Sequence, residues 1–370
     1  MAKVRMRDVA EHAGVSVRTV SNVVSGYAHV SAATRAKVQR SLDELGYQMD
    51  YLARGLRSGR TGFIALAVPF LAEPYFAELA QAVVRAAARR GLTVLVESTD
   101  GDAEVERRII AGGLTNVADG VLLSALTVPE DAASGSSSAP DFPLVLLGEH
   151  GVGDRFPRVG IDNVAAARTV VDHLLEQGCR RIVALGSNGS ENGRQRTEGY
   201  REAMAAARIR PANQLIVPVQ DWTRRQGHET VRKLLDGEGG PLPDGVFAYN
   251  DALAIGALRA LDAVGVRVPE EIAVASIDDV QEAAYAHPPL TSVAPDLDVI
   301  AERALTLLEE QAGRHGAPGG GTGGAGNAGQ AAQAAQAAET TEAERIGSAQ
   351  TPAPFRLVVR ESSRHARRQD

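Results

Sequence analysis

Apolar residues follow two different spacings along this chain. Up to about residue 46 they recur every three or four positions, as on one face of a helix. The apolar positions of this part are Met6, Val9, Ala10 and Ala13, then Val20, Val23 and Val24, then Val38, Leu42 and Leu45. From residue 62 onward, short apolar runs alternate with longer amphipathic segments. The pattern predicts three short N-terminal helices followed by strand–helix units.

The first two predicted helices are joined by a tight turn. Gly14 lies in this turn, where a residue with positive φ is often needed. Ser16 and Ser31 are good N-caps for the second and third helices, and Gly46 ends the third. Two helices joined by a short turn that contains Gly are typical of a helix-turn-helix motif. The alternative is a small helical hairpin with no ligand.

The long second part reads as two series of strands and helices. The first series has strands at 63–68, 93–97, 120–123 and 144–147 and helices at 75–90 and 103–115. The second series has strands at 159–161, 181–185, 215–219, 246–249 and 272–277 and helices at 164–177, 194–207, 223–235 and 252–264. Such repeats predict two doubly wound α/β lobes with parallel sheets, which bind small ligands at the carboxyl ends of their strands.

The charge is divided unevenly between these two parts. Residues 1–60 contain ten Lys and Arg and five Asp and Glu, a net charge of +5, whereas the whole chain carries −7. The other 310 residues are therefore at −12. A basic head on an acidic body indicates a polyanionic partner for the head alone, which favours nucleic acid over a hairpin without a ligand.

Several other classes of protein do not fit the sequence. The start is polar and basic, and no apolar run reaches the length of a membrane span, so we expect a cytoplasmic, nucleoid-associated protein and no membrane contact. Cys179 is the only cysteine, and the eight His residues show no metal-ligand spacing. No phosphate-binding loop, dinucleotide fingerprint or nucleophile elbow is present. We therefore expect no enzyme activity, no catalytic residue, no metal and no cofactor.

The N-terminal segment resembles the LacI/GalR family of bacterial transcriptional repressors. The resemblance rests on three ordered motifs and then continues through most of the chain. The motifs are Asp8-Val9-Ala10…Ala13-Gly14-Val15-Ser16…Thr19-Val20-Ser21, Val30-Ser31…Thr34-Arg35…Val38, and Leu45-Gly46-Tyr47. The resemblance implies a helix-turn-helix head joined by a hinge helix to a two-lobed core like that of periplasmic sugar-binding proteins.

The resemblance also implies which residues contact DNA. Those on or near the second helix could read base edges in a major groove: Ser16, Val17, Arg18, Thr19, Ser21, Asn22 and His29. In the hinge, Leu56 would be an apolar wedge in the minor groove, with Ala53 beside it. Gly55 would cost this helix about 1 kcal/mol relative to Ala, so we expect the hinge to fold only on DNA. An ordinary basic linker is the alternative for this segment.

A second set of matched positions implies an effector site between the lobes. These positions combine aromatic faces with charged and amide groups, as in a pocket for a polyol: Tyr75, Phe76, Glu149, Arg196, Trp222, Asn250, Asp251 and Asp278. Many family members have an Asp where this chain has Gly148 followed by Glu149, so that contact is either moved by one residue or lost. Ser190 and Asn192 stand where nucleobase-binding members place other donors, which favours a sugar over a purine.

Structural roles are the alternative for several of these residues. Asp251 could cap the following helix, and Tyr75, Phe76 and Trp222 could belong to the core. Arg196 and Asp278 could form an internal salt bridge.

The predicted organisation has five parts. They are a helix-turn-helix domain at 1–49, a hinge at 50–61, a first lobe at 62–160 plus 292–313, a second lobe at 161–291 plus 351–362, and a disordered low-complexity insertion at 314–350. The insertion is predicted because its Gly tract and Ala/Gln repeats cannot bury enough surface to order themselves. The chain should cross between the lobes near Ile161 and again near Ser292.

We therefore expect a sequence-specific DNA-binding transcriptional repressor whose operator affinity is switched by a small-molecule effector, a sugar or sugar derivative. Its partners would be double-stranded operator DNA, that carbohydrate effector and a second copy of the chain, because a homodimer matches the two half-sites of an operator. Two alternatives stay open, a solute-binding protein and a sugar-acting α/β enzyme without DNA regulation. The basic head opposes the first, and the lack of a nucleophile–base or metal set opposes the second.

Overall fold

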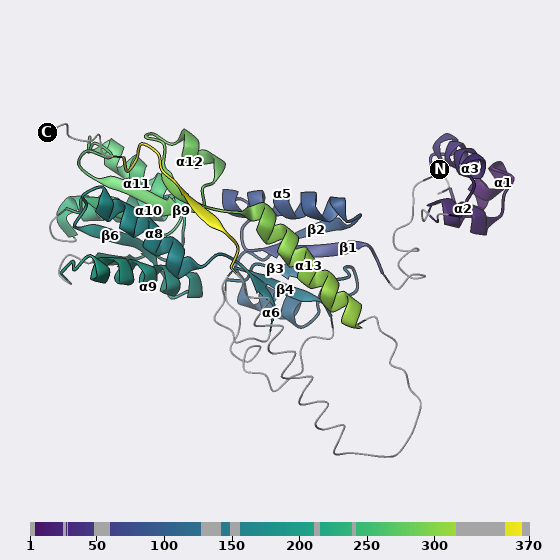
Figure 1. Ribbon diagram of the computed structural model, residues 1–370, viewed down its shortest axis with the longest axis horizontal. Coiled ribbons are helices and arrows are strands. Elements are labelled where there is room, and N and C mark those ends of the chain that lie inside the picture. The colour runs from purple at the N-terminus through teal and green to yellow at the C-terminus, as the bar shows by residue number, and fades with distance from the viewer. Residues whose placement is uncertain are drawn as a thin grey trace, which may run out of the picture. The chain divides into compact units, whose positions relative to one another are not determined.

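A computed structural model describes residues 4–24, 27, 29–47, 60–126, 142–148, 156–210, 215–238, 242–315 and 352–364. They belong to two compact units, one within residues 1–61 and the other within residues 62–370 (Figure 1). The predicted hinge, apart from residues 60 and 61, and the predicted insertion after residue 315 lie outside the described residues.

The first unit contains the three predicted helices. They are α1 (Met6–His12), α2 (Val17–Val24) and α3 (Ala32–Glu44). Gly14 has a φ of +54° in the turn between α1 and α2. The hydroxyl of Ser16 accepts a hydrogen bond from the Thr19 amide at 3.1 Å, and that of Ser31 accepts one from the Thr34 amide at 3.2 Å. Both serines therefore cap their helices as expected.

A small apolar core holds these helices together. All three helices, and the turn after α1, contribute to it with Val9, Ala10, Ala13, Val20, Val23 and Val38. These side chains follow the helical spacing seen in the sequence, because each helix buries one stripe. The outer face of α2 is thereby left to solvent.

The first sheet of the second unit is parallel and has the strand order β2-β1-β3-β4-β5. Its strands are β1 (Phe63–Val68), β2 (Thr93–Ser98), β3 (Val121–Leu123), β4 (Leu144–Leu147) and β5 (Arg158–Val159). The helices α5 (Pro74–Arg89) and α6 (Ala103–Ile110) connect the first strands. The sequence predicted α6 to continue to residue 115. It ends earlier, because Gly112 adopts a φ of +96° that an α-helix does not allow.

The second sheet has the order β11-β10-β9-β8-β6-β7, and only β11 runs antiparallel to its neighbour. Its strands are β6 (Ile182–Ser187), β7 (Leu215–Pro218), β8 (Gly245–Ala248), β9 (Ala273–Ile277), β10 (Thr291–Pro295) and β11 (Phe355–Val358). The helices of this lobe are α8 (Asn163–Glu176), α9 (Glu191–Ala206), α10 (Arg224–Lys233), α11 (Asp251–Ala263) and the short α12 (Gln281–Tyr285). A π-helical turn, Leu234–Glu238, follows α10. Two parallel sheets flanked by helices confirm the predicted fold class.

The second crossing between the lobes lies later than the sequence predicted. Ser292 is the second residue of β10 and pairs with β9 and β11, so it belongs to the second sheet. The chain leaves this sheet only after Pro295, and α13 (Leu297–His315) then packs on the first lobe. Gln311 of α13 exchanges two hydrogen bonds with the backbone of Leu144 in β4. The sequence placed this crossing near Ser292, a few residues too early, because pairing with β9 and β11 keeps residues 291–295 in the second sheet.

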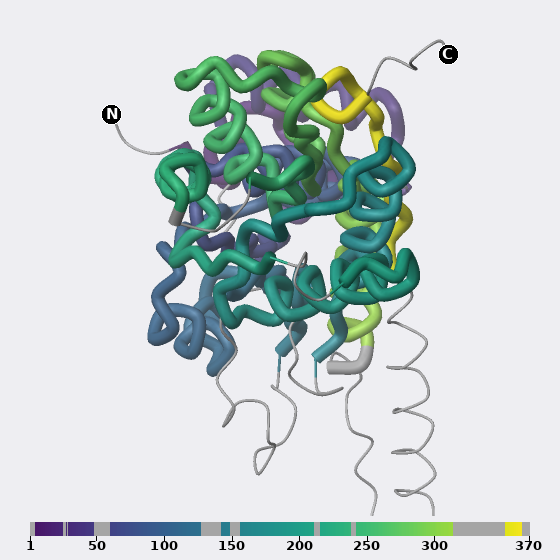
Figure 2. The backbone as a smooth tube through the Cα atoms, turned by 90° about the vertical axis from the view of Figure 1, so that its left-hand side faces the viewer, coloured from purple at the N-terminus to yellow at the C-terminus, as the bar shows by residue number. Residues whose placement is uncertain are grey.

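Three segments pass side by side between the lobes. The amide of Ala353 donates to the carbonyl of Gly160 at 2.7 Å, and the amide of Asp296 donates to Pro354 at 3.0 Å. Figure 2 shows the yellow C-terminal segment running along these crossings. These three crossing segments therefore join the two lobes. Helix α5 of the first lobe faces the second lobe at a separate place.

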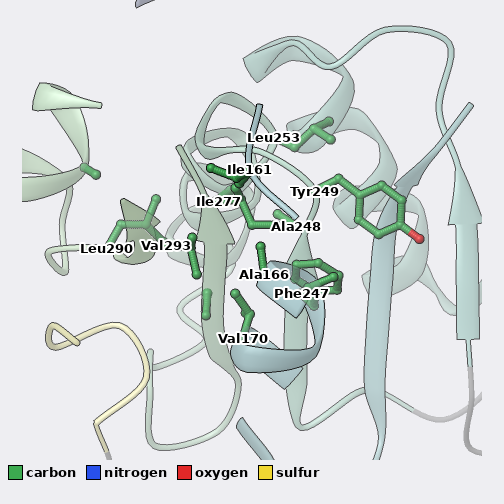
Figure 3. Packing of buried hydrophobic residues seen from close by; sticks show 14 of the residues in the cluster. Ile161, Ala166, Val170, Phe247, Ala248, Tyr249, Leu253, Ile277, Leu290 and Val293 are labelled. Carbon is green, nitrogen blue, oxygen red and sulfur yellow. The ribbon is translucent and has the colours of Figure 1, made fainter. Parts of the chain in front are cut away.

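The core of the second lobe is formed by its sheet and the helices on it. Phe247 and Tyr249 follow one another along β8 and its end, and Ala166 and Val170 of α8 pack nearby with Val293 (Figure 3). The strands carry continuous apolar runs because both faces of a parallel sheet are covered. Polar side chains consequently gather at the strand ends.

Candidate DNA-binding surface and effector site

The candidate DNA-reading residues lie on the outer side of α2. Ser16, Val17 and Arg18 are exposed, whereas Thr19, Ser21 and Asn22 are half-buried. Val17 is 43 % exposed at the start of α2, so its side chain is accessible to a partner. His29 is exposed and stacks edge-to-face against Tyr27 at 5.4 Å between ring centroids. The two predicted hinge contacts, Ala53 and Leu56, lie outside the described residues.

Arg196 is the centre of the candidate effector site. Its side chain projects from α9 and is only 6 % exposed. Its Nε donates to Oδ1 of Asn163 at 2.8 Å, one of its terminal nitrogens donates to the carbonyl of Tyr249, and the other lies 4.0 Å from the carboxylate of Asp278. Burial lowers the pKa of the guanidinium, and the charge of Asp278 opposes this effect. Arg196 is thus held rigidly by three partners.

Trp222 forms an aromatic wall beside Arg196. The guanidinium carbon of Arg196 lies 5.0 Å from the centre of the indole ring, a cation–π distance. The indole Nε1 donates to the carbonyl of Gly186 at 2.6 Å, and the ring meets Tyr249 edge-to-face at 6.0 Å. Gly186 has a φ of +139°, and a Cβ there would lie 2.6 Å from Tyr249. The glycine is therefore required for this wall to form.

Asp278 follows β9 in a loop with unusual backbone angles. Its φ is +127° and that of Asp279 is +50°, values that side chains other than glycine rarely adopt. The carboxylate of Asp278 faces Arg196, and no hydrogen bond to it comes from the described residues. Burial raises its pKa well above 3.8, with Asp251, Glu78 and Glu73 acting in the same direction and Arg196 against it. An acidic group held in this way can accept from a ligand's hydroxyls.

The first lobe contributes two aromatic residues at the start of α5. Tyr75 and Phe76 follow Pro74, the first residue of the helix, and stack edge-to-face at 5.3 Å. Both are half-buried and pack against the main core cluster. Burial and the charge of Asp278 raise the pKa of the Tyr75 phenol, which places this ring within electrostatic reach of the Arg196–Asp278 pair. Residues of both lobes therefore meet at one place.

The structure corrects the role expected for Asp251. Its side chain is fully buried, and Oδ1 accepts from the hydroxyls of Ser276 and Ser292 at 2.5 and 2.6 Å. Oδ2 accepts from the amide of Val280 at 2.9 Å. Both oxygens accept hydrogen bonds inside the lobe, so we propose a structural role for Asp251 in place of the expected ligand contact. It does not cap α11 either, because that role belongs to Asn250.

Asn250 is placed by this capping role. Its Oδ1 accepts from the amide of Leu253 at 2.9 Å, and its Nδ2 donates to the carbonyl of Trp222 at 3.3 Å. It thereby joins the start of α11 to the aromatic wall. The remaining predicted contact, Glu149, lies outside the described residues.

Sequence patterns missed three polar residues of this region, Asn163, Glu73 and Glu78, and named Asn192 only as a position that differs from nucleobase-binding members. Asn163 orients Arg196, and Asn192, one helical turn before Arg196 on α9, carries a buried Oδ1 with no hydrogen-bond partner among the described residues. Glu73, just before α5, and Glu78, on α5, lie within electrostatic reach of Asp278 across the boundary between the lobes. The i, i+4 spacing of Asn192 and Arg196 was a usable signal for a shared helix face. Nothing local marked the two glutamates.

Two features of the described residues bear on other kinds of function. Within the described residues, no helix is long and apolar enough to cross a membrane. Within the same ranges, no three His, Cys, Asp or Glu side chains are grouped so as to hold a metal ion.

Comparison with known protein families identifies both parts of the chain. Residues 5–50 match the model of bacterial regulatory proteins of the lacI family. Residues 171–321 match the model of a periplasmic binding protein-like domain.

Individual relatives cover most of the chain. The ribose operon repressor of Halalkalibacterium halodurans is 34% identical over 304 residues, which are 81% of this chain and 88% of that protein. A solved complex of the transcriptional regulator CelR with cellobiose is 29% identical with a TM-score of 0.61, covering 97% of this chain and 99% of that one. The crystal structure of the Lac repressor dimer bound to operator and an anti-inducer shares the fold, with 24% identity, a TM-score of 0.75 and coverage of 98% and 99%.

Two of these relatives are named as a repressor and a transcriptional regulator, the class of function that the sequence predicted. With a lacI-family match in the head, a periplasmic binding protein-like match in the core and a relative of this similarity, the chain belongs to the LacI family of bacterial transcriptional regulators.

Proposed function

We propose that this regulator is a repressor whose affinity for operator DNA is changed by a sugar that binds between the two lobes of its core. The observation that carries the proposal is the grouping of Arg196, Trp222 and Asp278 with Tyr75 of the opposite lobe. Aromatic faces suit the apolar faces of a sugar ring, and a buried carboxylate and guanidinium suit its hydroxyls. The relatives named for ribose and complexed with cellobiose make these two sugars the first to test.

The head would supply base reading through Arg18 and its neighbours on α2. Effector and operator binding are then linked, so the sugar must change operator affinity by the same factor by which operator changes sugar affinity. We place this activity in the cytoplasm, at operator sites on the chromosome. For the core we propose the lobe boundaries given by the sequence with one change: the second lobe extends to Pro295, the last residue of β10.

We further propose a homodimer, with the first lobe supplying part of the interface. Strand β2 is at the edge of its sheet and exposes Leu95 and Val96 to 40 and 42 %. Val84 of α5 is 39 % exposed beside Arg85 on the outer side of that helix. An apolar edge strand is a liability unless another chain covers it. Two copies would present two heads to the two half-sites of an operator.

The test is a thermal-shift screen with D-ribose, cellobiose and D-glucose, followed by operator binding with and without each hit. A true effector raises the melting temperature by mass action and changes operator affinity. Emission from Trp222, the single tryptophan, gives a second readout at the site. Sugars that leave both melting and operator binding unchanged, or that are turned over at enzymatic rates, would contradict the proposal.

A further inference from the structure

The loop that carries Asp278 is held by four consecutive backbone amides. Three of these amides donate to acceptors of the same lobe, at 2.9 to 3.0 Å. The amide of residue 278 donates to the carbonyl of Val293, that of 279 to the hydroxyl of Ser292, and that of 280 to the carboxylate of Asp251. The fourth acceptor belongs to the other lobe. Oε1 of Glu78, on α5, accepts from the amide of Gln281 at 2.8 Å.

This fourth hydrogen bond also caps a helix. Gln281 is the first residue of α12, and the residue in the N-cap position is Val280, whose side chain forms no capping hydrogen bond. The first amides of a helix need acceptors from outside it, and valine has none to offer. Glu78 therefore supplies, from the first lobe, the cap that the second lobe lacks.

A second contact joins the lobes close by. Arg224, the first residue of α10, lies 3.5 Å from the carboxylate of Glu73. Glu73 stands just before α5, and Arg224 comes two residues after Trp222. Figure 1 shows α12 next to the N-terminal end of α5. Both contacts therefore join α5 to segments that also carry effector-site residues.

We propose that Glu78 is a positioning residue that couples closure of the two lobes to the Asp278 loop by capping α12 across the lobe boundary. Opening the lobes removes the acceptor of Gln281, three residues from Asp278. A ligand that holds Asp278 in place also holds this amide in place for Glu78. The proposal rests on the proposed function for its link to operator binding, but the closure itself does not require a known effector.

The strength of the hydrogen bond between Glu78 and Gln281 suits a contact that controls the balance between closed and open lobes. Glu78 is half-buried and Gln281 is exposed, so water competes for the hydrogen bond once the lobes separate. Loss of one such bond should shift the ratio of closed to open forms by about fivefold. A shift of this size is small enough for a ligand that prefers one form to reverse it.

The experiment measures the distance between the lobes in the ligand-free protein. Spin labels are attached at two exposed positions, Ala88→Cys on α5 and Arg259→Cys on α11, in a Cys179→Ala background. Pulsed electron–electron double resonance then gives the distribution of distances between the two labels. Glu78→Ala should move population toward longer distances. Glu78→Gln retains an acceptor oxygen and should restore the parent distribution. Gln81→Ala, exposed one turn further along α5, is the matched control and should change nothing.

A change on the other lobe tests the same bond independently. Gln281→Pro removes the donor amide, and proline is well tolerated at the first position of a helix after an extended residue such as Val280, whose ψ is 156°. It should open the lobes as Glu78→Ala does, and the double variant should add nothing further. A parent-like distribution in Glu78→Ala, no rescue by Glu78→Gln, or additive effects in the double variant would overturn the proposal. Operator binding, measured separately, reports on the proposed function.

Discussion

The crossing of α10 and α11 gives the sharpest test of the packing in the second lobe. Gly256 of α11 faces the backbone of α10, so a Cβ built on it would lie 2.0 Å from the carbonyl oxygen of Arg224 and 2.8 Å from the amide nitrogen of His228. Gly227 faces α11 in the same way, at 2.1 Å from the carbonyl oxygen of Leu253. Ordinary contact begins at 3.4 Å. The helices would have to separate by more than an ångström to accept a methyl group.

Two opposing energies decide the effect of Gly256→Ala. Alanine favours a helix over glycine by about 1 kcal/mol. Overpacking costs about 1–3 kcal/mol and more where the obstacle is backbone, which cannot rotate away. We therefore expect a net loss of about 2 kcal/mol, or a fall of about 4–8 °C in melting temperature for a core of this size.

Gly313→Ala is the matched control. Gly313 lies in α13, and a Cβ there would meet nothing within 4 Å. Only the helix preference acts, so we expect a gain of up to about 1 kcal/mol. Both variants are compared by thermal and urea unfolding, followed by circular dichroism. Since α10 begins two residues after Trp222, Gly256→Ala should also change tryptophan emission, and Gly313→Ala should not. Equal stability of the two variants would refute the reasoning.

Three further outcomes are expected. Burial raises the pKa of Asp251 from 3.8 to about 7, so the protonated side chain adds to the free energy of unfolding. This stabilisation, up to about 4 kcal/mol, is complete below about pH 4 and is lost as the pH rises through 7. Asp251→Asn should make urea stability less dependent on pH between 4 and 7; an unchanged slope would count against this. Arg18→Ala should relax base preference at one operator position by about 1–3 kcal/mol, measured with a set of single-base operator variants, whereas equal weakening on all of them would make Arg18 a phosphate contact. Leu95→Lys should lower the dimer fraction in sedimentation, and a dimer of parental stability would exclude β2 from the interface.

Much of the fold followed from local patterns in the sequence. The helices of the head were predictable because each buries one stripe of apolar residues and because Ser16 and Ser31 cap their own helices. The strands of the core were predictable because a strand covered on both faces is a continuous apolar run. Arg196, Trp222 and Asp278 could be selected as site residues from their motifs, and they do meet in space.

Other features depend on residues that are far apart in the chain. Asp251 follows Asn250 in a motif that suggested a ligand contact. In the structure the hydroxyls of Ser276 in β9 and Ser292 in β10 donate to its carboxylate, and only the packing of the sheet brings these residues together. Likewise, β10 belongs to the second sheet because β9 and β11 pair with it on either side.

The sequence by itself determined the head, the α/β class of the core and the chemical types at the candidate effector site, because periodicity, caps and motifs are local. Only the tertiary structure decided that the carboxylate of Asp251 is buried among hydrogen-bond donors of its own lobe and that the carboxylate of Glu78, on α5, caps α12 in the other lobe. Glu78 and Gln281 are separated by 203 residues, and no local pattern carries information on such a pair. Their contact exists because three chain crossings bring the two lobes together.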